Sequence, residues 1–592
     1  MCGFAGELRH DGAEADLAAL ERMKRSLAPR GPDAGGSFQR GALGLCHRRL
    51  TIIDLSAAGE QPMVDSELGL SLVFNGCIYN YRELKQELSD AGYRFFSNSD
   101  TEVILKAYHR WGPDCVSRFF GMFAFVIAER DSGRLVMARD RLGIKPLYWS
   151  KGPGFLRFAS TLQALVAGGG VDTSIDTAAL HHFMSFHSVV PAPLTICKGV
   201  RKLPAATLRI VEADGTERDQ VYWRASFTRP ERMLEPGAWR EQLLGALKRA
   251  VKRRMVADVP TGVLLSGGLD SSLIVALLAQ SGQAGLRTFS IGFEPAGGMS
   301  GDEFEYSDLI ARTFGTEHHQ IRIEDSRLVP AVLPAIRAMS EPMVSHDAVA
   351  FYLLSQEVVK HVKVVQSGQG ADEVFAGYDW YPPLAQVPRA DALAAYTKVF
   401  CDWTHEQLQS MVSPDSLAKD DVSRRFVAEH FAAPGADTTL DAALRLDSLV
   451  MLVDDPVKRV DNMTMAWGLE GRVPFLDHEL VELAAGCPPE LKLAQGGKGV
   501  LKDAARALLP AAIIDRPKGY FPVPGIRHLQ GELYDVVRQA LSNRAARERG
   551  IFQPSYIQRL LDDPNGLRSN LGVNALWQAG LLELWLQELH AT

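Results

Sequence analysis

Residues 262–272 read GVLLSGGLDSS and join an apolar run to a loop of small residues. The run 262–265 predicts a buried strand, and the loop 266–272 opens a helix predicted over 273–280. Backbone N–H groups of a glycine-rich loop can approach phosphate oxygens, and the helix amino terminus adds positive potential there. A plain turn that caps a core helix is the structural alternative. The chain contains no G-x-x-x-x-G-K-[ST] motif, so the loop used for γ-phosphoryl transfer is not expected.

The alternation of strand and helix continues beyond this loop. Further strands are predicted at 288–293 and 361–366, with a helix around 306–314 between them. The later strand ends in SGQGADE at 367–373. This pattern predicts a doubly wound α/β domain with a parallel sheet, whose ligands lie at the carboxyl ends of the strands. The remainder of the chain, to Thr592, is predicted to be mainly helical.

Two carboxylates follow two of these strands. Asp270 lies in the first loop and Asp372 in the second. Since Mg²⁺ prefers few protein ligands when it is carried with phosphates, the pair is predicted to hold a Mg²⁺–pyrophosphate complex. Solvated loop carboxylates are the alternative.

The first part of the chain has a different pattern, which predicts an α+β domain. Its apolar runs are short and separated by turn signals. We predict strands at 69–74, 121–128 and 135–138, and helices at 81–91 and 101–111. A polar segment rich in charge divides the chain into a domain at 1–211, a linker at 212–236 and a second domain at 237–592.

Composition narrows the class of protein. The 592 residues carry a net charge of −7 with no block of like charge, so no nucleic-acid partner is expected. No apolar run approaches the roughly 20 residues that cross a bilayer, and no secretory signal is recognisable. The seven cysteines are scattered and form no C-x-x-C pair, which favours a reducing compartment. We therefore expect a cytoplasmic enzyme.

Cys2 is a candidate nucleophile. Removal of Met1 would leave Cys2 with a free α-amine whose pKa, near 7.7–8.0, lets it take the thiol proton close to neutral pH. The thiolate could then attack the side-chain amide of glutamine. A cysteine at position two is, taken alone, more often a chance start.

The neighbours of Cys2 in the predicted domain strengthen this hypothesis. The motifs RGPD at 30–33, HRRL at 47–50, NG at 75–76 and SDTE at 99–102 lie at the ends of predicted elements. A glutamine site needs a guanidinium for the α-carboxylate, a carboxylate for the α-ammonium, and oxyanion donors. These groups are present as Arg49, Asp100, and Asn75 with Gly76. Taken singly, Arg49 could be a surface charge and Asn75-Gly76 a hairpin turn.

In order and spacing these motifs resemble the class II (amino-terminal-nucleophile) glutamine amidotransferase domain. The resemblance implies an antiparallel sandwich with helices, Cys2 as nucleophile, Arg49 and Asp100 as clamps for glutamine, and Asn75 with Gly76 as oxyanion hole. One departure is Cys77, because the family usually has glutamate after Asn-Gly.

The two parts together resemble glutamine-hydrolysing asparagine synthetases, with an ATP-pyrophosphatase type of loop at 266–272. Further matches are TFSIGF at 288–293, DNMTM at 461–465 and EGRVPFLD at 470–477. The resemblance implies that Lys498 stabilises the adenylating transition state. It also implies that ATP is bound by Leu264, Ser266, Gly267, Gly268, Asp270, Ser271, Ile291, Ser367 and Gly368.

The chemistry implied is an ATP-dependent carbon–nitrogen ligation. ATP converts a carboxylate to an acyl-adenylate, and ammonia from glutamine then displaces AMP through an enclosed passage. A glutaminase without ligase activity, a binding protein on an inactive scaffold and a β-lactam synthetase are the alternatives. The intact loop with Asp270, Asp372 and Lys498 argues against the first two. The partners expected are small molecules, and the oligomeric state is open, with a homodimer as one option.

The acceptor is suggested by departures from the asparagine-making pattern. Asparagine synthetases have Ser-Gly-Glu-Gly-Ser-Asp-Glu at the second loop, whereas this chain has Gln369 and Ala371. An amide cannot take a proton from attacking ammonia as a glutamate would. The segments NGCIYNY at 75–81, FHSVVPAP at 186–193 and SEPMVSHD at 340–347 are similar to bacterial enzymes that complete N-acetylglutaminylglutamine amide, an osmoprotectant. The expected acceptor is therefore that acetylated dipeptide, with aspartate as the alternative.

Overall fold

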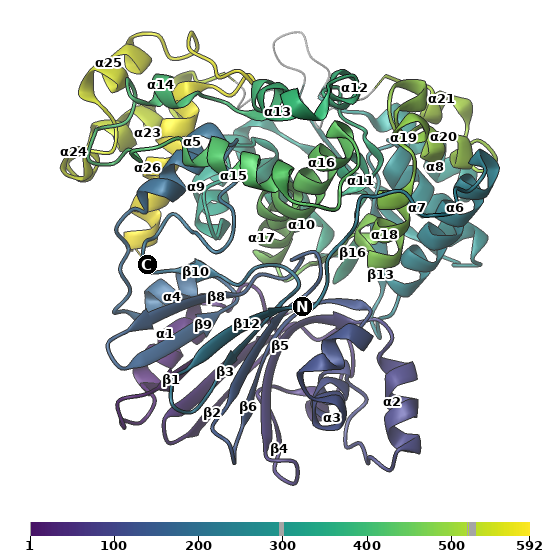
Figure 1. Ribbon diagram of the computed structural model, residues 1–592, viewed down its shortest axis with the longest axis vertical. Helices are drawn as coiled ribbons and strands as arrows, with labels where there is room; N and C mark the ends of the chain where they lie inside the picture. Colours follow the sequence, from purple (N-terminus) through teal and green to yellow (C-terminus); the bar gives the residue numbers. More distant parts are fainter. Residues whose placement is uncertain (1, 295–300, 518, 520–527, 592) are drawn as a thin grey trace.

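The computed structural model describes residues 2–294, 301–517, 519 and 528–591. Two antiparallel sheets form the lower part of Figure 1, and a parallel sheet with many helices forms the upper part. The amino terminus lies where the two parts meet (Figure 1). The predicted fold class, an α+β domain followed by a doubly wound α/β domain, is confirmed.

The amino-terminal domain is a sandwich of two six-stranded sheets. The first has the order β10-β8-β9-β1-β3-β2 and the second β12-β11-β7-β6-β5-β4. The strands of the first sheet are β1 (Gly3–Arg9), β2 (Ala34–Arg40), β3 (Leu43–Arg49), β8 (Tyr148–Gly152), β9 (Phe155–Ala159) and β10 (Arg201–Lys202). Those of the second are β4 (Met63–Asp65), β5 (Leu70–Ile78), β6 (Gly121–Glu129), β7 (Leu135–Arg139), β11 (Thr207–Val211) and β12 (Glu217–Val221).

Apolar residues that alternate along the strands bury the facing surfaces of both sheets. Phe4, Val73 and Val126 lie in the core between them. Helices α1 (Leu17–Ser26) and α4 (Leu162–Gly168) cover the outer face of the first sheet, and α2 (Tyr81–Asp90) and α3 (Asp100–Trp111) that of the second. The strands predicted at 121–128 and 135–138 form β6 and β7, which pair as an antiparallel hairpin with Ala128 opposite Leu135.

The carboxyl-terminal domain is built on a parallel sheet in the order β15-β14-β13-β16-β17. The strands are β13 (Thr261–Leu264), β14 (Arg287–Phe293), β15 (Glu317–Ile323), β16 (Val364–Gln366) and β17 (Glu470–Arg472). Counted along the chain, the five parallel strands lie in the order third, second, first, fourth, fifth. The chain therefore adds strands first to one side of β13 and then to the other, and the strand order reverses between β13 and β16. In doubly wound folds the ligand lies at such a switch point.

Helices cover both faces of this sheet. On one face pack α6 (Pro236–Arg253), α7 (Leu269–Gln280) and α18 (His478–Gly486), and on the other α9 (Leu328–Ala338), α10 (Asp347–Val358) and α17 (Lys458–Met465). Between β14 and β15 lies α8 (Phe304–Phe314), where a helix was predicted at 306–314. The described remainder of the chain is mainly helical, as predicted, and includes α11 (Ala371–Phe375), α13 (Ala392–Phe400), α15 (Val422–Ala432), α16 (Thr439–Leu446), α20 (Gly499–Ala505), α23 (Gly531–Ser542), α25 (Pro554–Asp562) and α26 (Ala575–Ala591).

Several predicted boundaries differ from the structure, since β16 begins at Val364 rather than at residue 361 and β5 ends at Ile78 rather than at residue 74. Helix α7 begins at Leu269 rather than at residue 273, because Gly268 is already the extended residue before the first turn. Asp270, Ser271 and Ser272 are therefore helical. The segment 212–236, expected as a linker, includes β12, which pairs with β11. The division of the chain at 211 and 236 stays a prediction.

A buried group of charges joins the two domains. Asp461 on α17 accepts a hydrogen bond from Arg30 Nη1 at 2.8 Å and one from Lys145 Nζ at 3.0 Å. All three side chains are buried. Burial opposes the charge on Asp461, but Arg30 and Lys145 outweigh it and hold its pKa at about 2. Against about 3.9 in an unfolded chain, this stabilisation is complete at neutral pH and is lost as the pH falls from about 4 through 2.

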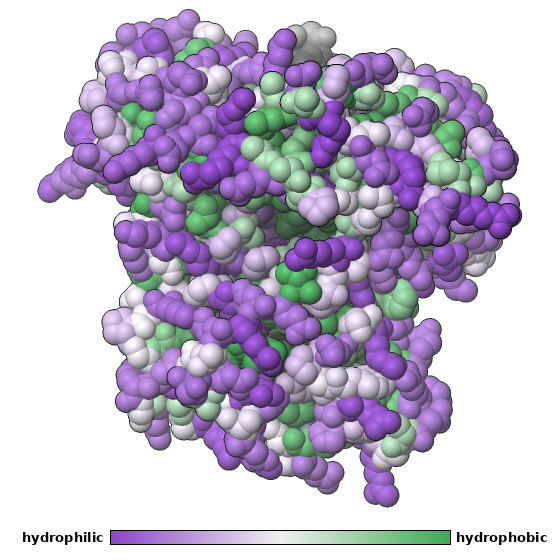
Figure 2. Space-filling model, in the orientation of Figure 1, coloured by the Kyte–Doolittle hydropathy of each residue, from purple (hydrophilic) through white to green (hydrophobic). Residues whose placement is uncertain are grey.

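The surface is largely hydrophilic on the face drawn in Figure 2, with apolar residues in small patches. Within the described ranges, no helix has the length and hydropathy to cross a membrane.

The buried charges predict a large effect of Asp461→Ala. Removing the carboxylate leaves Arg30 and Lys145 buried without their counter-charge, which should lower the free energy of unfolding by about 3–5 kcal/mol. Thermal and denaturant unfolding would measure it. Asp420→Ala is the matched control, since Asp420 is 77% exposed and should change stability by less than about 0.5 kcal/mol. Equal stability of the two variants would contradict this account of the domain interface.

Candidate active sites

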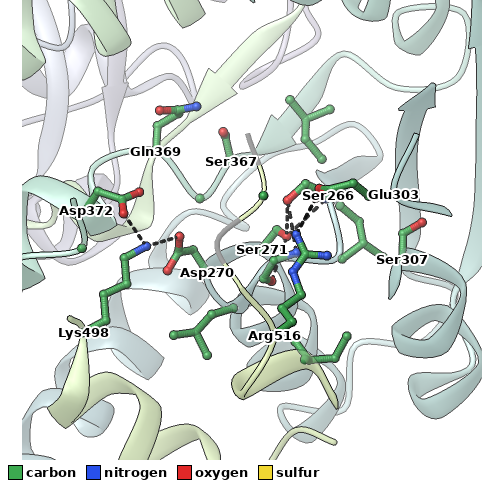
Figure 3. Close-up of a pocket in the computed structure, with 18 of the residues that line it drawn as sticks. Ser266, Asp270, Ser271, Glu303, Ser307, Ser367, Gln369, Asp372, Lys498 and Arg516 are labelled. Atoms are coloured by element: carbon green, nitrogen blue, oxygen red, sulfur yellow. Dashed lines mark hydrogen bonds and ion pairs between the residues drawn. The ribbon is translucent and has the colours of Figure 1, made fainter. Parts of the chain in front are cut away.

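A cavity of about 550 Å³ lies at the switch point, beside the carboxyl ends of β13 and β16 (Figure 3). Nearly all of the residues predicted to bind a nucleotide line it: Leu264, Ser266, Gly268, Asp270, Ser271, Ile291, Ser367 and Gly368. Gly267 is outside the lining. Its φ is +74°, and a Cβ there would lie 2.6 Å from the Ser307 backbone nitrogen, so glycine lets α8 approach the loop.

Lys498 joins the two predicted metal-binding carboxylates (Figure 3). Its Nζ lies 2.7 Å from Asp270 Oδ2 and 3.0 Å from Asp372 Oδ1. Burial opposes the charge on Lys498, but the two carboxylates outweigh it and raise its pKa. Lys498 has a φ of +55° just before α20, a strained conformation for a residue with a side chain. The fold therefore brings together a cation and two carboxylates from three separate segments.

This set of donors fits Mg²⁺ carried with phosphates. Asp270 and Asp372 converge on one point, and Mg²⁺ usually keeps waters and substrate phosphates as its other ligands. In the part of the chain that the structure describes, no group of three or more His, Cys, Asp or Glu side chains forms a metal-binding cluster. A dedicated all-protein metal cage is therefore not the arrangement seen.

The cavity wall also contains an ion pair that the sequence did not indicate. Arg516 donates from Nη2 to Glu303 Oε1 at 2.8 Å (Figure 3). Its guanidinium also lies over the Tyr306 ring, 4.2 Å from the ring centroid. Asp347 lies elsewhere in the lining, as does Gln369. Neither Arg516 nor Glu303 belongs to a recognisable motif. The two residues are 213 positions apart in the sequence, so their contact could not be predicted from it.

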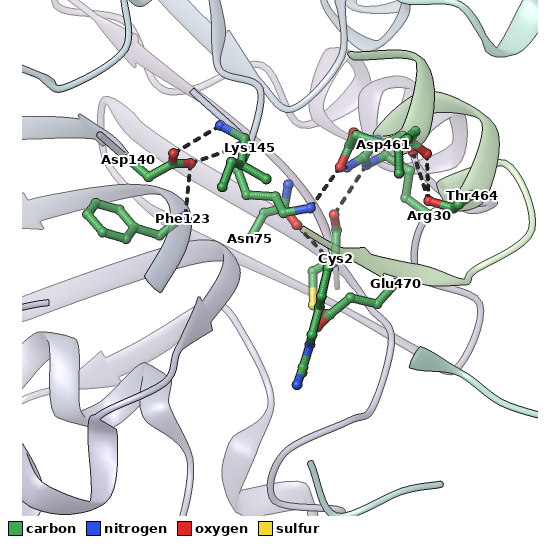
Figure 4. Close-up of polar contacts among 12 residues, drawn as sticks. Cys2, Arg30, Asn75, Phe123, Asp140, Lys145, Asp461, Thr464 and Glu470 are labelled. Atoms are coloured by element: carbon green, nitrogen blue, oxygen red, sulfur yellow. Dashed lines mark hydrogen bonds and ion pairs between the residues drawn. The ribbon is translucent and has the colours of Figure 1, made fainter. Parts of the chain in front are cut away.

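Cys2 lies in a second, smaller pocket at the domain interface (Figure 4). Its backbone nitrogen donates to Asn75 Oδ1 at 3.1 Å, and its Sγ lies 4.0 Å from the Leu50 carbonyl oxygen. The residue is 8% exposed, and burial raises the pKa of its thiol. A nearby base is therefore needed to form the thiolate at neutral pH. The predicted removal of Met1 lies outside the described residues.

The predicted oxyanion donors Asn75 and Gly76 lie close to Cys2: Asn75 is hydrogen-bonded to its backbone nitrogen, and Gly76, unlike Asn75, is among the residues that line the pocket. Within the described residues the Asn75 Nδ2 is buried without a hydrogen-bond partner, although its Oδ1 is held by Cys2. An orphaned buried donor is costly unless a ligand uses it. Gly76 has a φ of +155°, and a Cβ there would lie 2.1 Å from the Met122 carbonyl oxygen, so only glycine fits.

The predicted clamps for glutamine line the same pocket, of about 30 Å³. Arg49 donates from Nη1 to the Ser56 carbonyl at 2.9 Å and from Nη2 to the Asp54 carbonyl at 2.5 Å, which fixes its guanidinium. Asp100 accepts from the Ile78 N–H at 3.0 Å, and burial raises its pKa to about 6. Cys77 is also part of the wall.

Two further residues of this pocket were missed by sequence reasoning. Glu470 and Arg472, both on β17 of the carboxyl-terminal domain, line it beside Cys2. Both belong to the motif EGRVPFLD at 470–477, but nothing in the sequence indicates that this motif contacts the amino-terminal domain.

The antiparallel sandwich carries the Cys2 pocket, and the domain packed against it carries a loop-lined cavity at the switch point of its parallel sheet. Together these two sites define the class of protein as a two-site amidotransferase. The family model described as "Glutamine amidotransferase domain" matches residues 1–223. The chain belongs to the asparagine synthase family, whose model matches residues 242–587.

Curated relatives extend over nearly the whole chain. It is 31% identical to asparagine synthetase [glutamine-hydrolyzing] 1 of Bacillus subtilis, with 99% of this chain and 96% of the relative covered. A putative asparagine synthetase of Mycobacterium tuberculosis is also 31% identical, over 99% of this chain and 97% of its own. Asparagine synthetase B of Escherichia coli is 28% identical, over 88% and 82%. The predicted family and the predicted class, an ATP-dependent ligase with glutamine as amide donor, are confirmed.

The orphaned amide predicts the effect of Asn75→Ala on glutamine hydrolysis. Loss of one oxyanion donor should lower kcat by about 10²- to 10³-fold. Glutamate release from glutamine, followed without any acceptor, measures this. Asn98→Ala is the matched control, because Asn98 is exposed, whereas Asn75 is buried and hydrogen-bonded to Cys2. Unchanged hydrolysis in Asn75→Ala would exclude Asn75 as an oxyanion donor.

Proposed function

We propose that this protein adenylates a carboxylate with ATP and converts it to a carboxamide with ammonia released from glutamine at Cys2. The acceptor proposed is the carboxyl-terminal carboxylate of N-acetylglutaminylglutamine. The observation that carries the reaction class is the pair of sites in one chain: a buried thiol beside an orphaned amide, and Lys498 between two carboxylates at the switch point.

Hydrolysis of glutamine begins with the Cys2 thiol. Once Met1 is removed, the α-amine of Cys2 takes the thiol proton, and the thiolate attacks the amide carbon of glutamine. Asn75 Nδ2 and the Gly76 N–H donate hydrogen bonds to the oxyanion that forms. Collapse of the tetrahedral intermediate expels ammonia as the amine returns the proton, and water then releases glutamate from the thioester.

Activation of the acceptor takes place in the larger cavity. The acceptor carboxylate attacks the α-phosphate of ATP, which forms an acyl-adenylate and releases pyrophosphate. Lys498 lies where its charge can stabilise the negative charge that develops on the phosphate. Asp270 and Asp372 would hold Mg²⁺, which neutralises the charge of the leaving pyrophosphate. Ammonia then attacks the acyl carbon, loses a proton and displaces AMP.

Two segments that carry the likeness to the dipeptide-amidating enzymes support the choice of acceptor. They pack together, since the Val344 N–H lies 3.4 Å from Ser188 Oγ. One of them supplies Asp347 to the cavity, where Gln369 also lies. An amide at position 369 suits an acceptor other than aspartate, because it cannot serve as the base that a glutamate provides. The product would be an osmoprotectant made in the cytoplasm, and a homodimer is the proposed assembly.

Asparagine synthesis from aspartate is the second candidate. The names of the relatives favour it, since several are asparagine synthetases.

The acceptor is tested by release of AMP and pyrophosphate with ATP, Mg²⁺ and glutamine, comparing N-acetylglutaminylglutamine with aspartate. The proposal expects turnover with the dipeptide alone. Turnover with aspartate alone would identify an asparagine synthetase and show that Gln369 does not exclude that substrate.

Lys498→Ala separates the two half-reactions. With the acceptor that supports turnover, AMP formation should fall by about 10²-fold or more, because the cation at the phosphates is lost. Hydrolysis of glutamine without ATP should remain, since Lys498 is not in the Cys2 pocket. If AMP formation were unchanged, Lys498 would have no part in adenylation.

A further inference from the structure

Strand β17 of the carboxyl-terminal domain forms part of the wall around Cys2. It is the outer strand of the parallel sheet and pairs with β16, with Val364 opposite Glu470 and Gln366 opposite Arg472. Both of its charged side chains line the Cys2 pocket, and Figure 4 shows Glu470 beside Cys2. The pocket is therefore incomplete in the amino-terminal domain alone.

Arg472 holds the Glu470 carboxylate in place. Its Nε donates to Glu470 Oε1 at 2.5 Å, and its Nη1 donates to the Arg254 and Val256 carbonyls at 2.7 Å each. Both side chains are almost fully buried. Because three acceptors fix the guanidinium, the carboxylate has a defined position in the pocket before any ligand enters.

The pocket presents two carboxylates, Asp100 from α3 and Glu470 from β17. Burial raises the pKa of Asp100 to about 6. Burial acts on Glu470 in the same sense, but the positive charges around it, the Arg472 guanidinium first and then the amino terminus and Lys145, outweigh it and hold its pKa at about 2. Glu470 is thus the carboxylate that is fully ionised near neutral pH. The neighbouring wall residue Cys77 is a buried neutral thiol whose pKa burial raises, so it supplies no charge.

Glutamine is a zwitterion, and its positively charged α-ammonium would be buried in this pocket. A buried charge is costly unless it is paired, so the pocket must supply a carboxylate for the α-ammonium. We propose that Glu470, held by Arg472, binds the α-ammonium of glutamine together with Asp100, the carboxylate predicted from the sequence, so that the carboxyl-terminal domain completes the glutamine pocket. Glu470 is a specificity-determining residue, and Arg472 is its positioning residue. The inference rests on the glutaminase activity proposed above.

The test compares glutamine with 4-carbamoylbutanoic acid, which has the same amide and carboxylate but lacks the α-amine. Wild-type protein should hydrolyse glutamine with a kcat/KM about 10- to 100-fold higher, the range of one charge-assisted hydrogen bond. In Glu470→Gln this preference should fall by at least about threefold, with hydrolysis of the analogue little changed. Glu241→Gln, an exposed change on α6, is the matched control and should keep the wild-type preference.

A second variant keeps the test independent of folding defects. Cys77→Glu returns a carboxylate to the same wall, so the double variant Cys77→Glu with Glu470→Gln should regain at least part of the preference for glutamine. A Glu470→Gln variant that loses both substrates equally, or that keeps the wild-type ratio, would overturn the assignment. Wild-type protein that hydrolyses neither substrate would instead refute the proposed function, which separates the two failures.

Discussion

The buried Asp461 carboxylate, shared between Arg30 and Lys145, is the interaction on which both sites depend. Arg30 also donates from Nε to the Cys2 carbonyl oxygen at 3.3 Å, so the cation that docks the domains also positions the nucleophile's backbone. The next residue, Asn462, accepts from the Ser340 N–H at 2.7 Å and fixes the segment that leads to the larger cavity. One turn of α17 thus sets the position of two distant pockets.

Charge is buried in both pockets, and the fold compensates it in the same way. Lys498 lies between Asp270 and Asp372, and Glu470 lies against Arg472. Isolated buried charges would be prohibitively costly, but such pairs are tolerated when hydrogen bonds fix their geometry. The backbone is constrained at the same places, with Gly76 pressed against β6 and Lys498 in a left-handed conformation. These sites therefore favour pre-set geometry over local stability.

Sequence reasoning located those parts of the sites that follow from local pattern. Loops after apolar strands meet at one edge of a parallel sheet, so Ser266, Asp270 and Ser367 could be assigned to one cavity before the structure was known. The start of α7 was misplaced because Leu269 can end a loop or begin a helix. Strand β17 was missed because Glu470 and Arg472 do not read as a buried strand. Their burial depends on each other and on backbone groups more than 200 residues away in sequence, such as the Arg254 carbonyl.

Strand β17 has only three residues, yet it contacts both pockets: its two charged side chains line the Cys2 pocket, and its backbone bonds to the wall of the larger cavity. Glu470 lies by Cys2, and the carbonyl oxygen of Arg472 accepts from the Ser367 N–H at 2.8 Å in the wall of the larger cavity. A substitution in this strand is therefore expected to change the geometry of both active sites. Over evolutionary time the two domains cannot be shuffled independently: an amino-terminal domain transplanted from a relative would meet a pocket wall selected beside a different partner.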